Sequence, residues 1–241
     1  MNSALAKMAK IQRGLQSTLG RRALSLGVGA ALEHDRILLK SRPDVVVDVG
    51  ANRGQFALAV INLNQDARIF SFEPLKAPAE TFENIFDGYN NVTLFKTAIG
   101  PSCYSAEINV SARDDSSSLL EIGAGQISVF PGTELAAKEA IQVKTLASCI
   151  TPSDLSSVSM LKIDVQGFEL QALEGCETLL SNFRFVYIES SFQELYISQA
   201  LVSDIFRWLL ERGFRFSDMG DISRDSAGNA VQSDFLFERV A

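Results

Sequence analysis

One stretch of the chain constrains its fold more than any other: an apolar, β-branched run that ends in an acidic residue and a turn containing two glycines. It reads Val45-Val46-Val47-Asp48-Val49-Gly50-Ala51-Asn52-Arg53-Gly54-Gln55, and a helical pattern follows it. A strand that passes through such a turn into a helix is typical of the first βα unit of a nucleotide-binding sheet. We therefore expect an α/β fold, a three-layer sandwich built on a mostly parallel sheet.

A second acidic residue closes the next apolar run. Glu73 follows the run at 67–72 and is itself followed by Pro74. In sheets of this kind, an acid at that position lies where it can bind the two hydroxyls of a ribose. A dinucleotide-binding turn would also carry Gly-x-Gly-x-x-Gly to hold a pyrophosphate, and the turn at 50–54 lacks that pattern. The pair of acids therefore predicts an adenosine-type cofactor and favours S-adenosylmethionine over a nicotinamide.

Composition narrows the class of protein. With 241 residues, of which 46% are hydrophobic, the chain can bury a full core in one domain. The formal net charge of −7 argues against nucleic acid as a partner, because a phosphate backbone needs a basic surface. Cys103, Cys149 and Cys176 are far apart and predict reduced thiols in a cytoplasmic protein. No apolar stretch reaches the ~20 residues that a membrane-spanning helix needs.

The first 32 residues differ from the rest of the chain. They contain basic residues but no acid before Glu33; the basic residues are Lys7, Lys10, Arg13, Arg21 and Arg22. The segment is compatible with a transit peptide, with a helix that contacts a membrane surface, or with a lid over the active site. We favour a leading helix that packs on the domain. The sequence thus predicts a basic helical extension over 1–37 and a catalytic domain over 38–241, and leaves the oligomeric state open.

Helical and strand patterns alternate along most of the chain. Strands are predicted at 44–49, 67–72, 92–96, 160–164 and 185–189, and helices at 30–41, 54–64, 77–87, 168–180 and 201–212. The segment 101–145 breaks this alternation, which predicts antiparallel strands and loops inserted over the sheet edge, where substrate selectivity usually resides. Two last strands, at 214–218 and 233–238, suggest the hairpin that ends a seven-stranded methyltransferase sheet, with an antiparallel last strand.

Candidate cofactor-binding residues gather where the predicted strands end, at their carboxyl ends. Gly50 would let the backbone approach the cofactor closely, although a tight turn without a ligand also explains a glycine there. Asp48 can accept hydrogen bonds from the turn amides or, through water, from the amino acid part of the cofactor. Asn52 and Gln55 lie at the start of the next helix, whose free N–H groups suit a carboxylate.

Two further acids end the fourth and fifth predicted strands. Asp164 could orient the acceptor, remove its proton or help to hold a divalent ion, although it could also cap the following helix. Glu189 would project into the same cleft, and two carboxylates there suit a general base or a metal pair for a sugar hydroxyl. The serines at 116–118 could contact the adenine or the acceptor, or form a polar loop tip. His34, the only histidine, is expected on a helix surface.

At these residues the chain resembles the FkbM family of S-adenosylmethionine-dependent methyltransferases. The matching segments are 48–55, 72–74, 173–175 and Lys162-Ile163-Asp164-Val165-Gln166-Gly167-Phe168-Glu169, within a resemblance over about 38–240. The resemblance implies a class I, Rossmann-like methyltransferase that methylates a hydroxyl on a sugar, glycan or polyketide by in-line displacement. It assigns Gly50, Asn52 and Gln55 to the methionine side and Glu73 to the ribose. It also places Ala98 near the adenine and Asp164 near the transferring methyl.

The chain departs from the family pattern at two places. Leu146-Ala147-Ser148 stands where the family often has Leu-Asp-Asp, and Gln166 stands where it often has Glu. The second change removes a charge from the cleft and weakens the case for a tightly held metal, so no metal-binding residue is predicted and the need for a divalent ion stays open. The change at 146–148 keeps open the alternative of a non-catalytic protein that retains the fold and binds the cofactor. A nicotinamide-dependent oxidoreductase is disfavoured, because the turn at 50–54 lacks the third glycine of the dinucleotide-binding pattern. Asp164 is the first candidate for the catalytic base and Glu189 the second.

Overall fold

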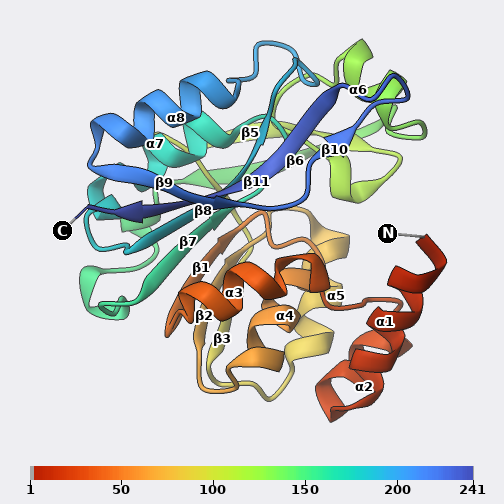
Figure 1. The fold of residues 1–241 in the computed structure, drawn as a ribbon, viewed down its shortest axis with the longest axis vertical. Helices are drawn as coiled ribbons and strands as arrows, with labels where there is room; N and C mark the ends of the chain where they lie inside the picture. The colour runs from red at the N-terminus through yellow and green to blue at the C-terminus, as the bar shows by residue number, and fades with distance from the viewer. Residues whose placement is uncertain (1–2, 241) are drawn as a thin grey trace.

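A mixed sheet with helices on both faces forms the centre of the molecule in the computed structural model (Figure 1). The structure describes residues 3–240. Residues 1 and 2 of the predicted extension over 1–37, and residue 241 of the predicted domain over 38–241, lie outside the described residues. The sheet has eight strands in the order β10-β11-β8-β7-β1-β2-β3, with β9 also paired to β11. The strands are β1 (Val45–Val49), β2 (Arg68–Phe72), β3 (Val92–Phe95), β7 (Ser159–Ile163), β8 (Phe185–Ser191), β9 (Phe214–Met219), β10 (Ser223–Arg224) and β11 (Ala230–Arg239).

The direction of the strands matches the predicted methyltransferase sheet. The first five of these strands run parallel, whereas β11 is antiparallel to its neighbours β8, β9 and β10. The predicted fold class and the antiparallel last strand are thus confirmed. The predicted count of seven strands is wrong, because β10 adds a strand at the edge. Its two residues, Ser223 and Arg224, lie in a turn-rich loop and are too few to show a strand pattern in the sequence.

Helices cover the sheet because its strands are apolar on both faces. All five residues of β1 are buried. Val46 packs with residues of α4 (Gln55–Leu63) on one face, and Val47 packs with residues of α7 (Glu169–Leu180) and α8 (Val202–Glu211) on the other. Figure 1 shows α4 on one side of the sheet and α7 and α8 on the other. The helices are α1 (Ser3–Leu15), α2 (Thr18–Ser25), α3 (Asp35–Ser41), α4 (Gln55–Leu63), α5 (Lys76–Phe86), α6 (Ala124–Val129), α7 (Glu169–Leu180) and α8 (Val202–Glu211). None of them, within residues 3–240, has the length and apolar character to cross a bilayer.

The segment that interrupts the alternation forms a second, three-stranded sheet. Its strands are β4 (Ala98–Ile99), β5 (Tyr104–Ser111) and β6 (Leu135–Lys144). As predicted, β5 and β6 are antiparallel, but β4 pairs with β6 in parallel. The glycine-rich stretch at 123–132, between β5 and β6, contains the short helix α6 (Ala124–Val129). A Cβ at Gly123 or Gly125 would lie 2.5 Å from a backbone carbonyl oxygen, so close packing explains these glycines.

The basic N-terminal segment forms two helices, α1 and α2, which cross closely. A Cβ at Gly20 would lie 2.3 Å from the carbonyl oxygen of Gly14. The Arg22 guanidinium on α2 donates hydrogen bonds to the carbonyl oxygens of Ile85 (3.1 Å) and Asp87 (2.7 Å) at the end of α5. These contacts attach the helical pair to the edge of the α/β unit.

Candidate active site

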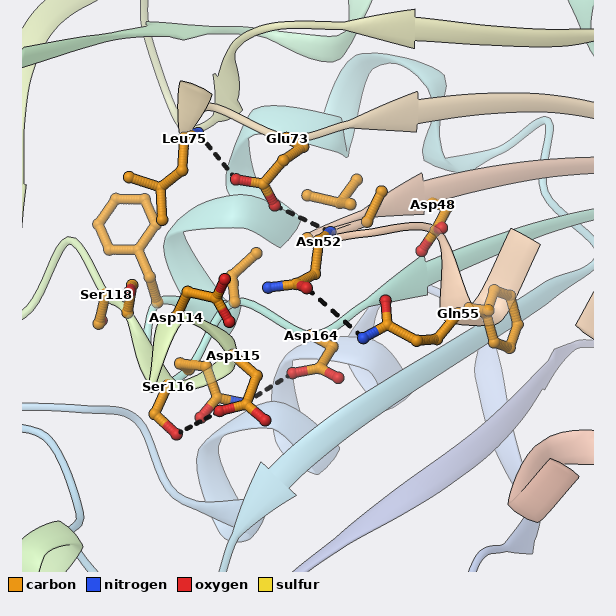
Figure 2. A pocket seen from close by; sticks show the side chains of 18 of the residues that line it. Asp48, Asn52, Gln55, Glu73, Leu75, Asp114, Asp115, Ser116, Ser118 and Asp164 are labelled. Carbon is orange, nitrogen blue, oxygen red and sulfur yellow. Dashed lines mark hydrogen bonds between the residues drawn. The ribbon is translucent and has the colours of Figure 1, made fainter. Parts of the chain in front are cut away.

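A cavity of about 430 Å³ opens at the carboxyl ends of β1, β2 and β7. This is the point where the strand order reverses: the chain proceeds from β1 toward β3 on one side and from β7 toward β11 on the other. Ligands of open α/β sheets bind at such switch points. The predicted residues that line the cavity are Asp48, Gly50, Asn52, Gln55, Glu73, Ala98 and Asp164. Figure 2 shows that several of these side chains converge on the same space.

The carboxylate of Glu73 lines the cavity and accepts hydrogen bonds from two backbone N–H groups. Its Oε2 accepts a hydrogen bond from the backbone N–H of Asn52 (2.9 Å), and its Oε1 accepts one from the N–H of Leu75 (2.8 Å), as Figure 2 shows. Burial raises the pKa of Glu73 to about 7, although these two hydrogen bonds oppose the rise. Each carboxylate oxygen can accept two hydrogen bonds, so one position on each oxygen stays available to a ligand. The pair suits the two adjacent hydroxyls of a ribose.

Asp48 is a buried carboxylate whose hydrogen bonding is incomplete. Its side chain lines the cavity and is 2% exposed, and its Oδ2 has no hydrogen-bond partner among the described residues. Burial raises the pKa of Asp48 to about 7, although Lys162 favours the charged form. An unpartnered carboxylate is destabilising unless a ligand supplies a donor. The α-ammonium group of S-adenosylmethionine is such a donor, so Asp48 and Glu73 together fit this cofactor.

The backbone around Gly50 requires a glycine, as the tight-turn interpretation of this residue expects. It has φ 87°, and a Cβ there would lie 1.8 Å from the carbonyl oxygen of Asp164. The N–H of Asp164 in turn donates to the carbonyl oxygen of Val49 (3.0 Å). The glycine therefore lets the turn after β1 pack directly against the end of β7, which brings the cofactor residues and Asp164 to one cavity.

The two predicted catalytic carboxylates are joined by an amide. Nε2 of Gln166 donates to Oδ1 of Asp164 (2.8 Å) and to Oε2 of Glu189 (2.9 Å). Nε2 of Gln232 donates to the other oxygen of Glu189 (2.7 Å), and the Tyr196 hydroxyl lies 3.0 Å from Oε1 of Gln166. Glu189 is absent from the described lining of the cavity, so it reaches the cavity through Gln166 and not directly.

Lys162 sets the charge of this carboxylate pair. The side chain is 2% exposed, and its Nζ lies 3.4 Å from Oδ2 of Asp164 and 3.6 Å from Oδ1 of Asp234. Burial by itself would raise the pKa of Asp164, but Lys162 and Gln166 outweigh it and lower the pKa. Burial and the neighbouring negative charges of Asp164 and Asp234 hold the pKa of Glu189 well above its usual range. Asp164 is therefore the more acidic member of the pair and is ionised at neutral pH.

The predicted place of His34 on a helix surface is wrong. Its ring lies 5.2 Å from the ring of Phe56 and 5.5 Å from that of Tyr187, and its Nδ1 lies 2.8 Å from the Tyr187 hydroxyl oxygen. It lines the cavity, and burial lowers the pKa of its imidazole. A single histidine ahead of the first strand carries no sequence signal for this contact, which joins two residues far apart in the chain, His34 and Tyr187 of β8.

The inserted segment covers part of the cavity. Ser116, Ser117 and Ser118 line it. Asp114, beside them, forms an ion pair with Arg53 of the turn after β1, and the Tyr196 hydroxyl donates to the carbonyl oxygen of Ser116 (2.9 Å). The inserted loop is thus held over the cofactor end of the sheet.

The structure shows the roles of two segments that the sequence left ambiguous, the start of α7 and residues 146–148. Asp164 does not cap α7, which has no side-chain cap among the described residues. Glu169, the first residue of α7, instead holds the turn before the helix, because its Oε1 accepts from the N–H groups of Val165 (3.1 Å) and Gly167 (3.0 Å). Residues 146–148, which replace the family's Leu-Asp-Asp, contribute nothing to the described lining of the cavity. Leu146 is instead buried in the core beside α7. Loss of the acid pair therefore leaves the cavity intact.

A methyltransferase family model and two curated methyltransferases match this chain. The model of the FkbM methyltransferase domain matches residues 48–216. The 2-O-methyltransferase NoeI of Sinorhizobium fredii is 28% identical over 68% of this chain and 70% of its own length. The hexuronic acid methyltransferase AglP of Haloferax volcanii is 25% identical over 64% of this chain and 59% of its own length. Among solved structures, Sp1610 of Streptococcus pneumoniae in complex with S-adenosyl-L-methionine has 12% identity and a TM-score of 0.46, over 85% of this chain and 72% of that chain.

The family match covers the turn after β1, Glu73, Asp164 and most of the sheet that positions them. The family match agrees with S-adenosylmethionine, the cofactor for which Asp48 and Glu73 provide hydrogen-bonding groups. It supports neither a nicotinamide-dependent oxidoreductase nor a non-catalytic binding protein. The chain belongs to the FkbM family of methyltransferases, and its methyl donor is S-adenosylmethionine.

Proposed function

We propose that the enzyme transfers the methyl group of S-adenosylmethionine to a hydroxyl oxygen of a sugar. The observation that carries the proposal is the position of Asp164, an ionised carboxylate that lines the same cavity as Asp48 and Glu73. The names of NoeI and AglP support a sugar as the acceptor class, because one is a 2-O-methyltransferase and the other acts on a hexuronic acid.

The cofactor contacts follow from the donors and acceptors around the cavity. Glu73 would accept hydrogen bonds from the ribose hydroxyls, and Asp48 would accept one from the α-ammonium group. Asn52 and Gln55, with the free N–H groups at the start of α4, would bind the α-carboxylate. Ala98, at the start of β4, would lie against the adenine. When bound, the cofactor supplies an electrophilic methyl group on a positively charged sulfur.

The protein's own contribution to the reaction is alignment and proton removal. An acceptor hydroxyl must lie about 3 to 3.5 Å from the methyl carbon and in line with the bond that breaks. A sugar hydroxyl is a weak nucleophile, so a base within hydrogen-bond reach should take its proton during attack. Asp164 suits this role because it is ionised, and its side chain is 36% exposed. Gln166 fixes one of its oxygens and leaves the other beside Lys162 and the cavity.

Glu189 remains the second candidate for the base. Its raised pKa matches a base that works near neutral pH, but its two oxygens are already engaged by Gln166 and Gln232. These contacts fit a group that orients Gln166, and through it Asp164, better than one that touches the acceptor. We therefore propose Asp164 as the base and Glu189 as a positioning residue.

The test is product analysis with a donor that carries a deuterated methyl group. The purified enzyme is incubated with this donor and a panel of mono- and oligosaccharides, and products are analysed by mass spectrometry and fragmentation. We expect a deuterated methyl ether on a sugar hydroxyl, made by the wild type and by Asp66→Asn, a control at an exposed acid. Asp164→Asn should give little product. A methyl group found on nitrogen or carbon would overturn the proposal.

A further inference from the structure

Helix α1 exposes a continuous apolar stripe. Leu5, Met8, Ile11 and Leu15 are 59%, 66%, 50% and 57% exposed. Residues spaced by three or four positions share one face of a helix, so these side chains form a single row along α1. Figure 1 shows α1 and α2 standing beside the rest of the molecule. An apolar row of this kind is a candidate surface for a partner.

The opposite face of α1 is held against the protein by charged groups. Lys10 Nζ lies 3.1 Å from Oε2 of Glu33, and Nη2 of Arg13 lies 2.5 Å from Oδ2 of Asp35. Gly14 is buried, because α2 crosses there. A surface helix of a water-soluble domain normally turns its apolar face to the core and its charges to solvent. Here the arrangement is reversed, so the contacts of α1 direct the stripe outward.

Charge and size indicate what covers the stripe. Lys7 and Arg21 are exposed near it, and a guanidinium nitrogen of Arg21 lies 3.0 Å from the carbonyl oxygen of Leu15 at the end of the stripe. The first 32 residues carry no acid, although the whole chain has a net charge of −7. A stable protein interface takes about 20 to 30 residues from each partner, many more than one row of four side chains. An anionic lipid surface, by contrast, attracts exposed Lys and Arg and accepts a short apolar face.

We propose that α1 binds the surface of an anionic lipid bilayer and inserts Leu5, Met8, Ile11 and Leu15 between the lipids. The helix would lie in the plane of the interface and would not cross it. Lys10, on the inner face of the same helix, lines the cavity. Binding through α1 therefore holds the cavity close to the membrane surface. The inference rests on α1 alone and not on the proposed reaction.

The test is co-sedimentation of the full chain with vesicles, which needs neither cofactor nor acceptor. Vesicles of phosphatidylcholine with phosphatidylglycerol are compared with vesicles of phosphatidylcholine alone. We expect the wild type to bind the anionic vesicles and to dissociate as salt is raised, because salt screens exposed charges. The double variant Met8→Glu, Ile11→Glu should lose at least tenfold in bound fraction, and Lys7→Glu, Arg21→Glu should also bind less.

Leu39→Glu is the matched control, because Leu39 is an equally exposed leucine (54%) on α3, outside the stripe. This variant should bind vesicles like the wild type, and circular dichroism should show that every variant is folded. Equal vesicle binding by the wild type and the Met8→Glu, Ile11→Glu variant would overturn the proposal, as would no binding at all. A wild-type dimer in light scattering that this double variant abolishes would assign the stripe to a second copy instead.

Discussion

Gly50 and Asp164 are packed so closely that a Cβ on Gly50 would lie 1.8 Å from the carbonyl oxygen of Asp164. The first residue belongs to the turn that we propose binds the cofactor, and the second, the proposed base, directly follows β7. Their contact joins the proposed cofactor site and the proposed base in one unit. A shift of either backbone segment would therefore disturb both functions.

Substitution of Gly50 should be more damaging than substitution of another glycine with the same backbone conformation. Gly50→Ala combines a clash with a positive φ and should lower the free energy of unfolding by about 3 kcal/mol or more. Gly88 has φ 84°, but no atom lies within 4 Å of the position that an added Cβ would take, so Gly88→Ala should cost only about 1 to 2 kcal/mol. Urea denaturation of both variants measures the difference, and equal losses would show that the close contact is unimportant.

We expect ionised Asp48 to lower the free energy of unfolding and, at the same time, to contribute to cofactor binding. Its pKa is about 7 in the folded protein and near its ordinary value in the unfolded chain, so the folded state keeps the proton to higher pH. Ionisation of Asp48 therefore opposes folding as the pH rises from about 4 to about 7, by up to about 4 kcal/mol. Asp48→Asn should be more stable than the wild type at pH 8, by a margin that shrinks at pH 5, and should bind S-adenosylhomocysteine weakly. The same margin at both pH values would contradict this account.

The two carboxylates joined by Gln166 should respond differently to neutralisation. Asp164→Asn removes the proposed base and should lower kcat by about a hundredfold or more, with little change in cofactor affinity. Glu189 holds its proton to a higher pH than a usual glutamate, so Glu189→Gln should change kcat only a few-fold at pH 7. Rates at saturating cofactor measure both effects. A larger loss in Glu189→Gln than in Asp164→Asn would make Glu189 the base.

The charges around the cavity should select against acidic acceptors. The lining includes more carboxylates than cations, namely Glu33, Asp48, Glu73, Asp114, Asp115 and Asp164 against Lys10, Arg113 and Lys162. Lys162 is already paired with Asp164. A neutral hexose should therefore have a higher kcat/KM than the corresponding hexuronic acid, and the gap should narrow at high salt. Preference for the uronic acid would show that Lys10 or Arg113 binds its carboxylate.

The local parts of this site could be predicted from the sequence, and the contacts across the fold could not. The strand, turn and helix around Asp48 and the position of Glu73 follow from hydropathy patterns and the ends of parallel strands. The bridge made by Gln166 depends on the separate strands β7 and β8 coming together. The sequence indicates only a lost charge at Gln166, whereas its amide donates to both carboxylates. The place of His34 and the two-residue strand β10 likewise depend on tertiary contacts.

The central claim is that the cavity binds S-adenosylmethionine through Glu73 and the turn after β1. Calorimetric titration of the purified protein with S-adenosylhomocysteine, the product of the donor, tests it most directly. NAD and the Glu73→Ala variant serve as controls. We predict saturable binding of S-adenosylhomocysteine to the wild type, strongly weakened binding to Glu73→Ala and no binding of NAD. Binding of NAD, or equal binding of S-adenosylhomocysteine by the wild type and Glu73→Ala, would contradict the account.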